Sequence, residues 1–341
     1  MKTAISALLL LCSCGGAFAQ DGAQQFASLG DFKLESGEVI RDCRIGYRAF
    51  GKLDSAKSNA VAFPTWFTGT SKELVDYVGA GKFVDPASYY VVTVDALANG
   101  ASSSPSTSTL QPRLKFPRIS VRDMVNSQHQ LLTQVLGIPH VKAVMGDSMG
   151  GMQTFQWIVA YPDFMEKAIP IVGSPRLAPY DLALWNGEIQ AIKGDPAWNN
   201  GDYSQQPAVS AIAYLEALVA TTPAKYNSDT SRDKVLASME DAKKGVASFD
   251  ANDRIRQLEA MIALDISRDF GGSMERAARA ARARVLVVVG KTDHTVSPGP
   301  ALEFARLMGA ETLELQGDCG HNSPECEVGL VSPTIAAFLA K

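Results

Sequence analysis

The sequence has little of what nucleic-acid-binding and metal-binding proteins need. Its 32 Lys and Arg are outnumbered by 36 Asp and Glu, for a formal net charge of −4. It therefore has no basic surplus with which to neutralise a phosphate backbone. Its four histidines are scattered, and neither a CxxC nor an HExxH motif occurs. These absences exclude the usual zinc patterns, so we expect no nucleic-acid partner, metal or cofactor.

Long apolar runs are also scarce, and the one at the N-terminus is short. Residues 4–12 follow Lys2 and lead to small residues that end in Ala17-Phe18-Ala19. A bilayer needs about 20 apolar residues, so we interpret residues 1–19 as a signal peptide cleaved before Gln20 rather than a membrane anchor. The mature chain is then expected to be secreted or periplasmic, without a transmembrane segment. A lipoprotein attached through Cys14 is the alternative.

Cysteine is rare once this segment is set aside. Loss of residues 1–19 leaves only Cys43, Cys319 and Cys326. The stretch between Cys319 and Cys326 contains Gly, Asn, Ser and Pro, which form turns. In an oxidising compartment this spacing favours a short disulfide over two free thiols.

What the sequence does contain is an alternation of β-rich and helical segments. Residues 32–40 and 43–50 predict a hairpin that turns at Ser36-Gly37. Nearly continuous apolar runs, typical of strands buried on both faces, occupy residues 60–64, 89–94, 141–145, 168–172, 285–289 and 312–315. Helical periodicity occupies residues 121–136, 149–161, 300–308 and 328–339. The alternation predicts an α/β fold with a mostly parallel sheet and helices on both faces.

One long segment interrupts this alternation. Residues 176–275 are polar and helical, without a convincing strand. We therefore divide the mature chain into a first core part (residues 20–175), a helical insertion (176–275) and a second core part (276–341). The serine-rich residues 101–109 predict a flexible loop. We expect the insertion and this loop to determine substrate selectivity.

The sharpest chemical signal is Gly146-Asp147-Ser148-Met149-Gly150, a G-x-S-x-G motif between an apolar strand and a helix. A serine in so tight a turn has strained backbone angles, and only small residues fit two positions away on either side. The hydroxyl then stands clear of the sheet. The backbone N–H of Met149 points to where an oxyanion would form. Ser148 is therefore the candidate nucleophile.

Such a serine needs a base and an acid, and in this motif's context they follow it in the order Asp, His. Asp293 and His321 each come just after a predicted parallel strand, where catalytic groups collect in open α/β sheets. His294 and Asp318 are the nearest rivals. We expect structural roles for His129 and His140, and a turn position for Asp147.

A second oxyanion donor is expected in the loop after the strand at residues 60–64. The backbone N–H of Phe67 is our choice, with that of Trp66 as the alternative. Each well-placed donor contributes on the order of 3 kcal/mol to stabilising the transition state.

Several blocks of the chain resemble the homoserine O-acetyltransferase branch of the α/β-hydrolase superfamily. They are Gly146 to Gln153 with Trp157 and Tyr161-Pro162, Phe116-Pro117 with Ile119, Val121 to Val125 with Gln128, Thr68-Gly69, and Asp269 to Gly272. The resemblance runs from about residue 33 to the C-terminus. It implies an α/β-hydrolase fold with a helical lid, a Ser148–Asp293–His321 triad, acyl transfer through an acyl-serine, and a possible homodimer through the lid.

One departure from that family bears on the substrate. Its members carry an acidic residue after the catalytic histidine, which helps to bind the acceptor's amino group, whereas this chain has Asn322. An exported enzyme would also lack cytosolic acetyl-CoA. We therefore expect an exported, esterase-like serine hydrolase that acts on a small acyl substrate. An O-acyltransferase of the homoserine O-acetyltransferase type is one alternative, and a non-catalytic binding protein on the same fold is another.

Overall fold

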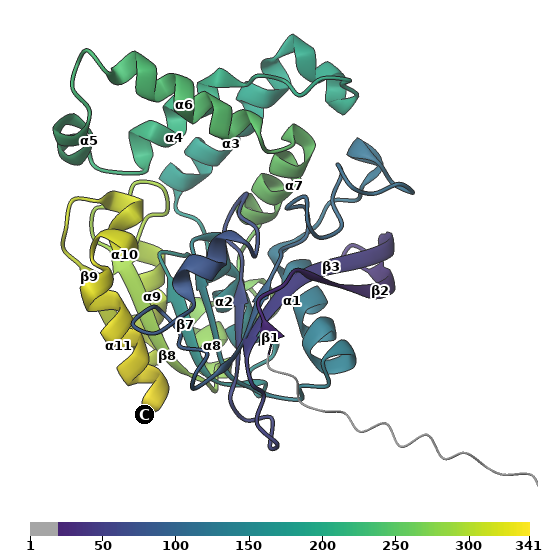
Figure 1. The fold of residues 1–341 in the computed structure, drawn as a ribbon, viewed down its shortest axis with the longest axis vertical. Helices are drawn as coiled ribbons and strands as arrows, with labels where there is room; N and C mark the ends of the chain where they lie inside the picture. Colours follow the sequence, from purple (N-terminus) through teal and green to yellow (C-terminus); the bar gives the residue numbers. More distant parts are fainter. Residues whose placement is uncertain (1–19) are drawn as a thin grey trace, which may run out of the picture.

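A computed structural model describes residues 20–341, and the predicted signal peptide, residues 1–19, lies outside the described residues. A nine-stranded sheet runs through the molecule in the order β1-β3-β5-β4-β6-β7-β8-β9, and β2 pairs with β3 beside this path (Figure 1). The strands are β1 Gln20–Asp21, β2 Gln25–Lys33, β3 Val39–Gly51, β4 Ala60–Pro64, β5 Tyr90–Val94, β6 Val141–Asp147, β7 Met165–Ile171, β8 Arg284–Gly290 and β9 Glu311–Leu315. The strands from β5 to β9 along this order pair in parallel, and β3 pairs antiparallel with β1, β2 and β5.

The strands that carry the site are buried on both faces. Every residue of β4 and β5 is buried, as is every residue of β8 after Arg284. Two apolar clusters result, one containing Trp157 and Phe304, the other containing Phe338. The expectation of a mostly parallel sheet with helices on both faces is confirmed.

The helices connect the strands and form the layers. They are α1 Val121–Gln130, α2 Met149–Ala160, α3 Pro179–Gly194, α4 Ser210–Val219, α5 Pro223–Asp229, α6 Val235–Ala247, α7 Ala251–Ile262, α8 Met274–Ala280, α9 Gly299–Met308, α10 Ser323–Cys326 and α11 Val328–Ala340. Among residues 20–341, no helix is long and apolar enough to cross a bilayer.

Helices α3 to α7 lie between β7 and β8, in the segment where the sequence predicts an insertion. Figure 1 shows α3, α4, α5 and α6 stacked beyond one end of the sheet, with α7 reaching down toward it. The insertion has a small apolar core that includes Ile192, Ile212 and Ile255. A β-bridge between Arg176 and Asp265 joins its two ends. We call α3 to α7 the lid.

Two expectations about local structure were wrong. The hairpin strand predicted from residue 32 begins at Gln25. The serine-rich stretch is packed rather than flexible, because Ser102 and Ser104 are fully buried. The Ser102 hydroxyl accepts a hydrogen bond from the Gly46 N–H (3.0 Å) and donates one to the Asp95 carbonyl (2.7 Å). Buried serines can anchor an irregular segment when their hydroxyls satisfy nearby backbone groups.

Candidate active site

Ser148 lies in the turn between β6 and α2, with φ 54° and ψ −118°. This positive φ is uncommon for a residue with a side chain and marks local strain. Its N–H donates to the Ile171 carbonyl of β7 (2.9 Å), which anchors the turn. A Cβ on Gly146 would lie 2.3 Å from the Gly150 carbonyl oxygen, and one on Gly150 would lie 2.6 Å from that of Pro64. The two glycines therefore permit the close packing that presents the serine.

Three side chains from distant parts of the chain meet above the sheet. His321 Nε2 lies 2.9 Å from Ser148 Oγ, and His321 Nδ1 lies 2.7 Å from Asp293 Oδ2. The other oxygen of Asp293 accepts the N–H groups of Thr295 (2.8 Å) and Val296 (2.9 Å). The structure thus brings together the three residues expected from the strand ends, in the order serine, imidazole, carboxylate.

The charges around His321 determine its protonation. Burial disfavours the imidazolium, but the carboxylate of Asp293, followed by those of Asp147 and Glu325, outweighs it and raises the pKa of His321 to about 9. The carboxylates therefore make this imidazole a stronger base than an isolated histidine.

The rival residues point elsewhere. His294 and Asp318 are exposed to solvent. The His129 ring stacks on that of Tyr161, with their centroids 3.9 Å apart, and His140 lies near Phe164. The expected turn position for Asp147 was wrong, because this residue ends β6, is buried and lines the pocket beside Ser148.

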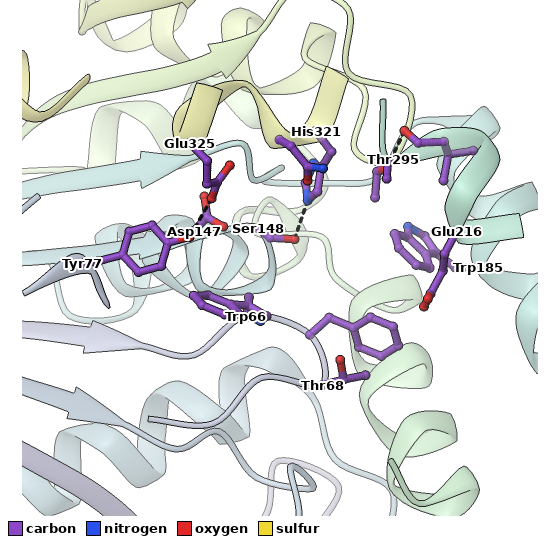
Figure 2. Close-up of a pocket in the computed structure, with 14 residues that line it drawn as sticks. Trp66, Thr68, Tyr77, Asp147, Ser148, Trp185, Glu216, Thr295, His321 and Glu325 are labelled. Carbon is purple, nitrogen blue, oxygen red and sulfur yellow. Dashed lines mark hydrogen bonds between the residues drawn. The ribbon is translucent and has the colours of Figure 1, made fainter. Parts of the chain in front are cut away.

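A pocket of about 500 Å³ opens over Ser148 (Figure 2). Its lining residues are Trp66, Phe67, Thr68, Tyr77, Asp147, Ser148, Trp185, Glu216, Val219, Ala220, Thr295, His321, Asn322 and Glu325. The lid contributes Trp185 of α3 and Glu216 of α4. None of residues 102–109 lines this pocket, but Ser106 hydrogen-bonds to Asp253 of α7 (2.9 Å), so the part of this loop in substrate selection stays a prediction. Within residues 20–341, no group of three or more His, Cys, Asp or Glu is arranged to hold a metal ion.

The loop after β4 forms one side of the pocket. Phe67 and Trp66 both line it, and the backbone N–H groups of Phe67 and Met149 donate no hydrogen bond to another residue of 20–341. The next amide, that of Thr68, donates to Gln257 Oε1 of α7 (2.9 Å). The Phe67 ring packs edge-on against Trp185 (5.6 Å). The lid therefore contacts this loop through α3 and α7.

The disulfide favoured by the sequence is present between Cys319 and Cys326. It closes the segment that carries both His321 and Glu325. Cys43 is a free, buried thiol.

Comparisons with known proteins place this geometry in a family. Residues 67–325 match the family model of the α/β hydrolase fold. The chain is 34% identical to the ethyl acetate hydrolase of Pseudomonas veronii over 88% of this chain and 89% of that one. It is 31% identical to the homoserine O-acetyltransferase of Symbiobacterium thermophilum, over 90% and 91%. The crystal structure of an acetylester hydrolase from Corynebacterium glutamicum superposes with a TM-score of 0.88 and 27% identity, over 94% and 96%.

The chain belongs to the α/β-hydrolase family. Its relatives are esterases and homoserine O-acetyltransferases, so it is an α/β-hydrolase-fold enzyme, either a hydrolase or an acyltransferase. The family resemblance expected from the sequence is confirmed.

Proposed function

We propose that this protein is an exported serine esterase that cleaves small acyl esters through an acyl-Ser148 intermediate. The observation that carries the proposal is the pair of hydrogen bonds from His321 to Ser148 (2.9 Å) and to Asp293 (2.7 Å), at the floor of a pocket. This is the arrangement that activates a serine hydroxyl for nucleophilic attack.

In the proposed mechanism, His321 Nε2 takes the proton of the Ser148 hydroxyl as Oγ bonds to the acyl carbonyl carbon. The resulting imidazolium, held by Asp293, gives that proton to the leaving alcohol oxygen as its bond to the carbonyl carbon breaks. Water then attacks the acyl-serine while His321 takes its proton, and Ser148 leaves with that proton restored.

The backbone N–H groups of Met149 and Phe67 are the proposed oxyanion donors. Their lack of other acceptors among the described residues supports this role, because such donors remain free for a substrate oxygen. Gln257 would then hold the loop in position through Thr68.

Two observations favour hydrolysis over acyl transfer. Asn322, which lines the pocket beside His321, stands where the family resemblance implies an acidic residue that helps to bind the acceptor's amino group. The ethyl acetate hydrolase is also somewhat more similar in sequence than the acetyltransferase. That similarity further points to acetyl esters as substrates.

Export is supported by the predicted signal peptide and by the Cys319–Cys326 disulfide, since such bonds persist in oxidising compartments. Cell fractionation of the full chain tests it: the protein is expected outside the cytoplasm without residues 1–19. Association through the lid, implied by the family resemblance, stays a prediction for measurement of mass in solution.

The enzymatic proposal is tested with a panel of short acyl esters and acyl thioesters, with and without alcohol acceptors. Wild-type protein is expected to release acid from the esters at a rate that does not depend on acceptor, whereas Ser148→Ala is inactive. If the protein transfers the acyl group of a thioester to an alcohol faster than it hydrolyses that thioester, it is instead an acyltransferase. A folded wild-type protein that turns over no substrate would favour the binding-protein alternative.

A further inference from the structure

Four residues form one end of the pocket, and the proposed reaction uses none of them. They are Asp147 at the end of β6, Glu325 in α10, and the aromatic residues Trp66 and Tyr77. Figure 2 shows the carboxylates of Asp147 and Glu325 close together on one side of Ser148, with Trp185 and Glu216 on the opposite side. We call these four residues the acidic end.

Asp147 has an unsatisfied hydrogen-bonding atom. The residue is 9% exposed, and its Oδ1 is buried with no hydrogen-bond partner. A buried carboxylate oxygen without a donor is costly, so such groups in native proteins call for a specific reason. Burial raises the pKa of Asp147 because it disfavours the charged carboxylate, and repulsion by the nearby Glu325 carboxylate adds to this, while the imidazolium of His321 acts in the opposite direction. A positively charged hydrogen-bond donor would supply the missing partner for the Asp147 carboxylate and would reduce its repulsion with Glu325.

The surrounding side chains offer no fixed cation. The residues that line the pocket include no Lys or Arg, and His321 is their only basic side chain. Glu216, at the opposite end, is already paired with Arg254 of α7 (2.7 Å). Within residues 20–341, Asp147 and Glu325 take part in no ion pair with a Lys or Arg. The acidic end therefore has no Lys or Arg partner, and the imidazole of His321 is the one basic group of the pocket lining beside it.

The aromatic side chains narrow the kind of cation that fits. The rings of Trp66 and Tyr77 pack edge to face, 5.6 Å apart, and both line the pocket. The Tyr77 hydroxyl donates to Glu325 Oε1 (2.8 Å), which fixes that carboxylate beside the rings. Aromatic rings attract organic cations, and carboxylates accept hydrogen bonds from an ammonium N–H. Together they suit an alkylammonium group better than a hydrated metal ion.

We propose that the acidic end binds an alkylammonium group in the alcohol part of the ester. This inference rests on the proposed function and adds a substrate class to it. The alcohol part is favoured because its oxygen must receive a proton from His321, and Glu325 lies four residues away in the same disulfide-closed segment. An ammonium placed there lies beside the carboxylates of Asp147 and Glu325, which both line the pocket, while the acyl carbonyl reaches Ser148.

The test compares two acetyl esters of equal shape, dimethylaminoethyl acetate and isopentyl acetate, near neutral pH. The first carries a protonated amine where the second carries a CH group. Wild-type kcat/KM is expected to favour the cationic ester roughly tenfold. The double variant Asp147→Asn/Glu325→Gln is expected to bring the ratio close to one. Because the ratio is taken within each variant, any general effect on Ser148 cancels.

Glu216→Gln is the matched control, since it removes a carboxylate from the opposite end of the same pocket. It is expected to keep the preference for the cationic ester. A wild-type ratio near one, a ratio that the double variant leaves unchanged, or an equal loss in Glu216→Gln would overturn the proposal.

Binding measured without turnover separates this inference from the esterase proposal. Calorimetric titration of Ser148→Ala with protonated dimethylaminoethanol is expected to show binding, which is lost when Asp147→Asn and Glu325→Gln are added. If neither ester is hydrolysed but the amine binds and the two carboxylate substitutions abolish that binding, the proposal for the acidic end is supported and the esterase proposal fails. If both esters are hydrolysed and the amine does not bind, the acidic end is contradicted while the esterase proposal survives.

Discussion

At the scale of single residues, His321 is the group on which the chemistry depends. Its imidazole must be neutral to accept the Ser148 proton, and the nearby carboxylates raise its pKa to about 9 against the effect of burial. Below that pKa most molecules carry an imidazolium that cannot act as base. We therefore expect kcat/KM for a neutral ester to rise with pH through an inflection near pH 9 and to level off above it, as measured by a pH–rate profile.

Removal of one carboxylate should move this profile in a defined direction. Glu325→Gln deletes a negative charge that stabilises the imidazolium, so the inflection is expected at lower pH than in wild type. Glu216→Gln, whose carboxylate is paired with Arg254, should leave it in place. An inflection that moves upward in Glu325→Gln, or equally in both variants, contradicts this interpretation.

The sequence made some of these residues predictable and not others. Ser148, Asp293 and His321 follow strands whose apolar composition is plain, and the carboxyl ends of parallel strands share one edge of a sheet. Tyr77 and Glu325 are 248 positions apart and meet only through tertiary packing. No local sequence pattern predicts that contact, so the grouping of these residues into the acidic end is visible only in the structure.

At the scale of elements, the turn between β6 and α2 depends on glycine. A Cβ at Gly150 would lie 2.6 Å from the Pro64 carbonyl oxygen, and backbone cannot yield cheaply there. Gly150→Ala is therefore expected to lower stability by about 1–3 kcal/mol, the usual cost of overpacking. Thermal and urea unfolding measure the loss.

The control is Gly187→Ala in α3, where an added Cβ meets nothing within 4 Å. Within a helix this change is expected to stabilise by about 0.5–1 kcal/mol. Equal behaviour of the two variants would show that the turn tolerates a side chain.

The Cys319–Cys326 disulfide closes the segment that holds His321. Replacing both cysteines with serine is expected to cost about 2 kcal/mol of stability, given the short loop. The kcat should also fall, because His321 loses part of its support. Unfolding and steady-state kinetics of the double variant test both effects. Unchanged kcat would mean that other contacts suffice to position the imidazole.

Helix α3 lies in the segment that the sequence predicts to be helical, but the sequence did not indicate where this helix begins and ends. Its buried residues include Asp181 and Glu188 as well as Trp185, Ile189 and Ile192. Helix prediction relies on apolar residues that recur on one face of the helix. Because two carboxylates lie on the buried face of α3, its apolar and polar faces are hard to distinguish in the sequence. The strands at residues 60–64 and 285–289, which lack such polar residues, were predictable almost to their ends.

At the scale of the whole molecule, the lid and the core build the site together. Gln257 of α7 accepts the Thr68 N–H (2.9 Å) and donates to the Leu97 carbonyl (3.3 Å), and so joins the lid to the proposed oxyanion loop. Gln257→Leu removes both bonds at similar size. We expect kcat to fall about tenfold through misplacement of the loop, with the inflection of the pH–rate profile unchanged.

Gln257→Glu keeps an acceptor for Thr68 and is expected to retain more of the wild-type kcat than Gln257→Leu. Steady-state kinetics of both variants make the comparison. A change confined to KM, or an equal loss of kcat in both, would argue against a positioning role for this residue.

The most direct test of the central claim, that His321 activates Ser148, is labelling with a fluorophosphonate followed by intact-mass and peptide mass spectrometry. Wild-type protein is expected to gain one adduct, at Ser148. Ser148→Ala should gain none, and His321→Ala should react far more slowly. A folded wild-type protein that stays unlabelled, or a Ser148→Ala variant labelled as fast as wild type, would contradict the claim.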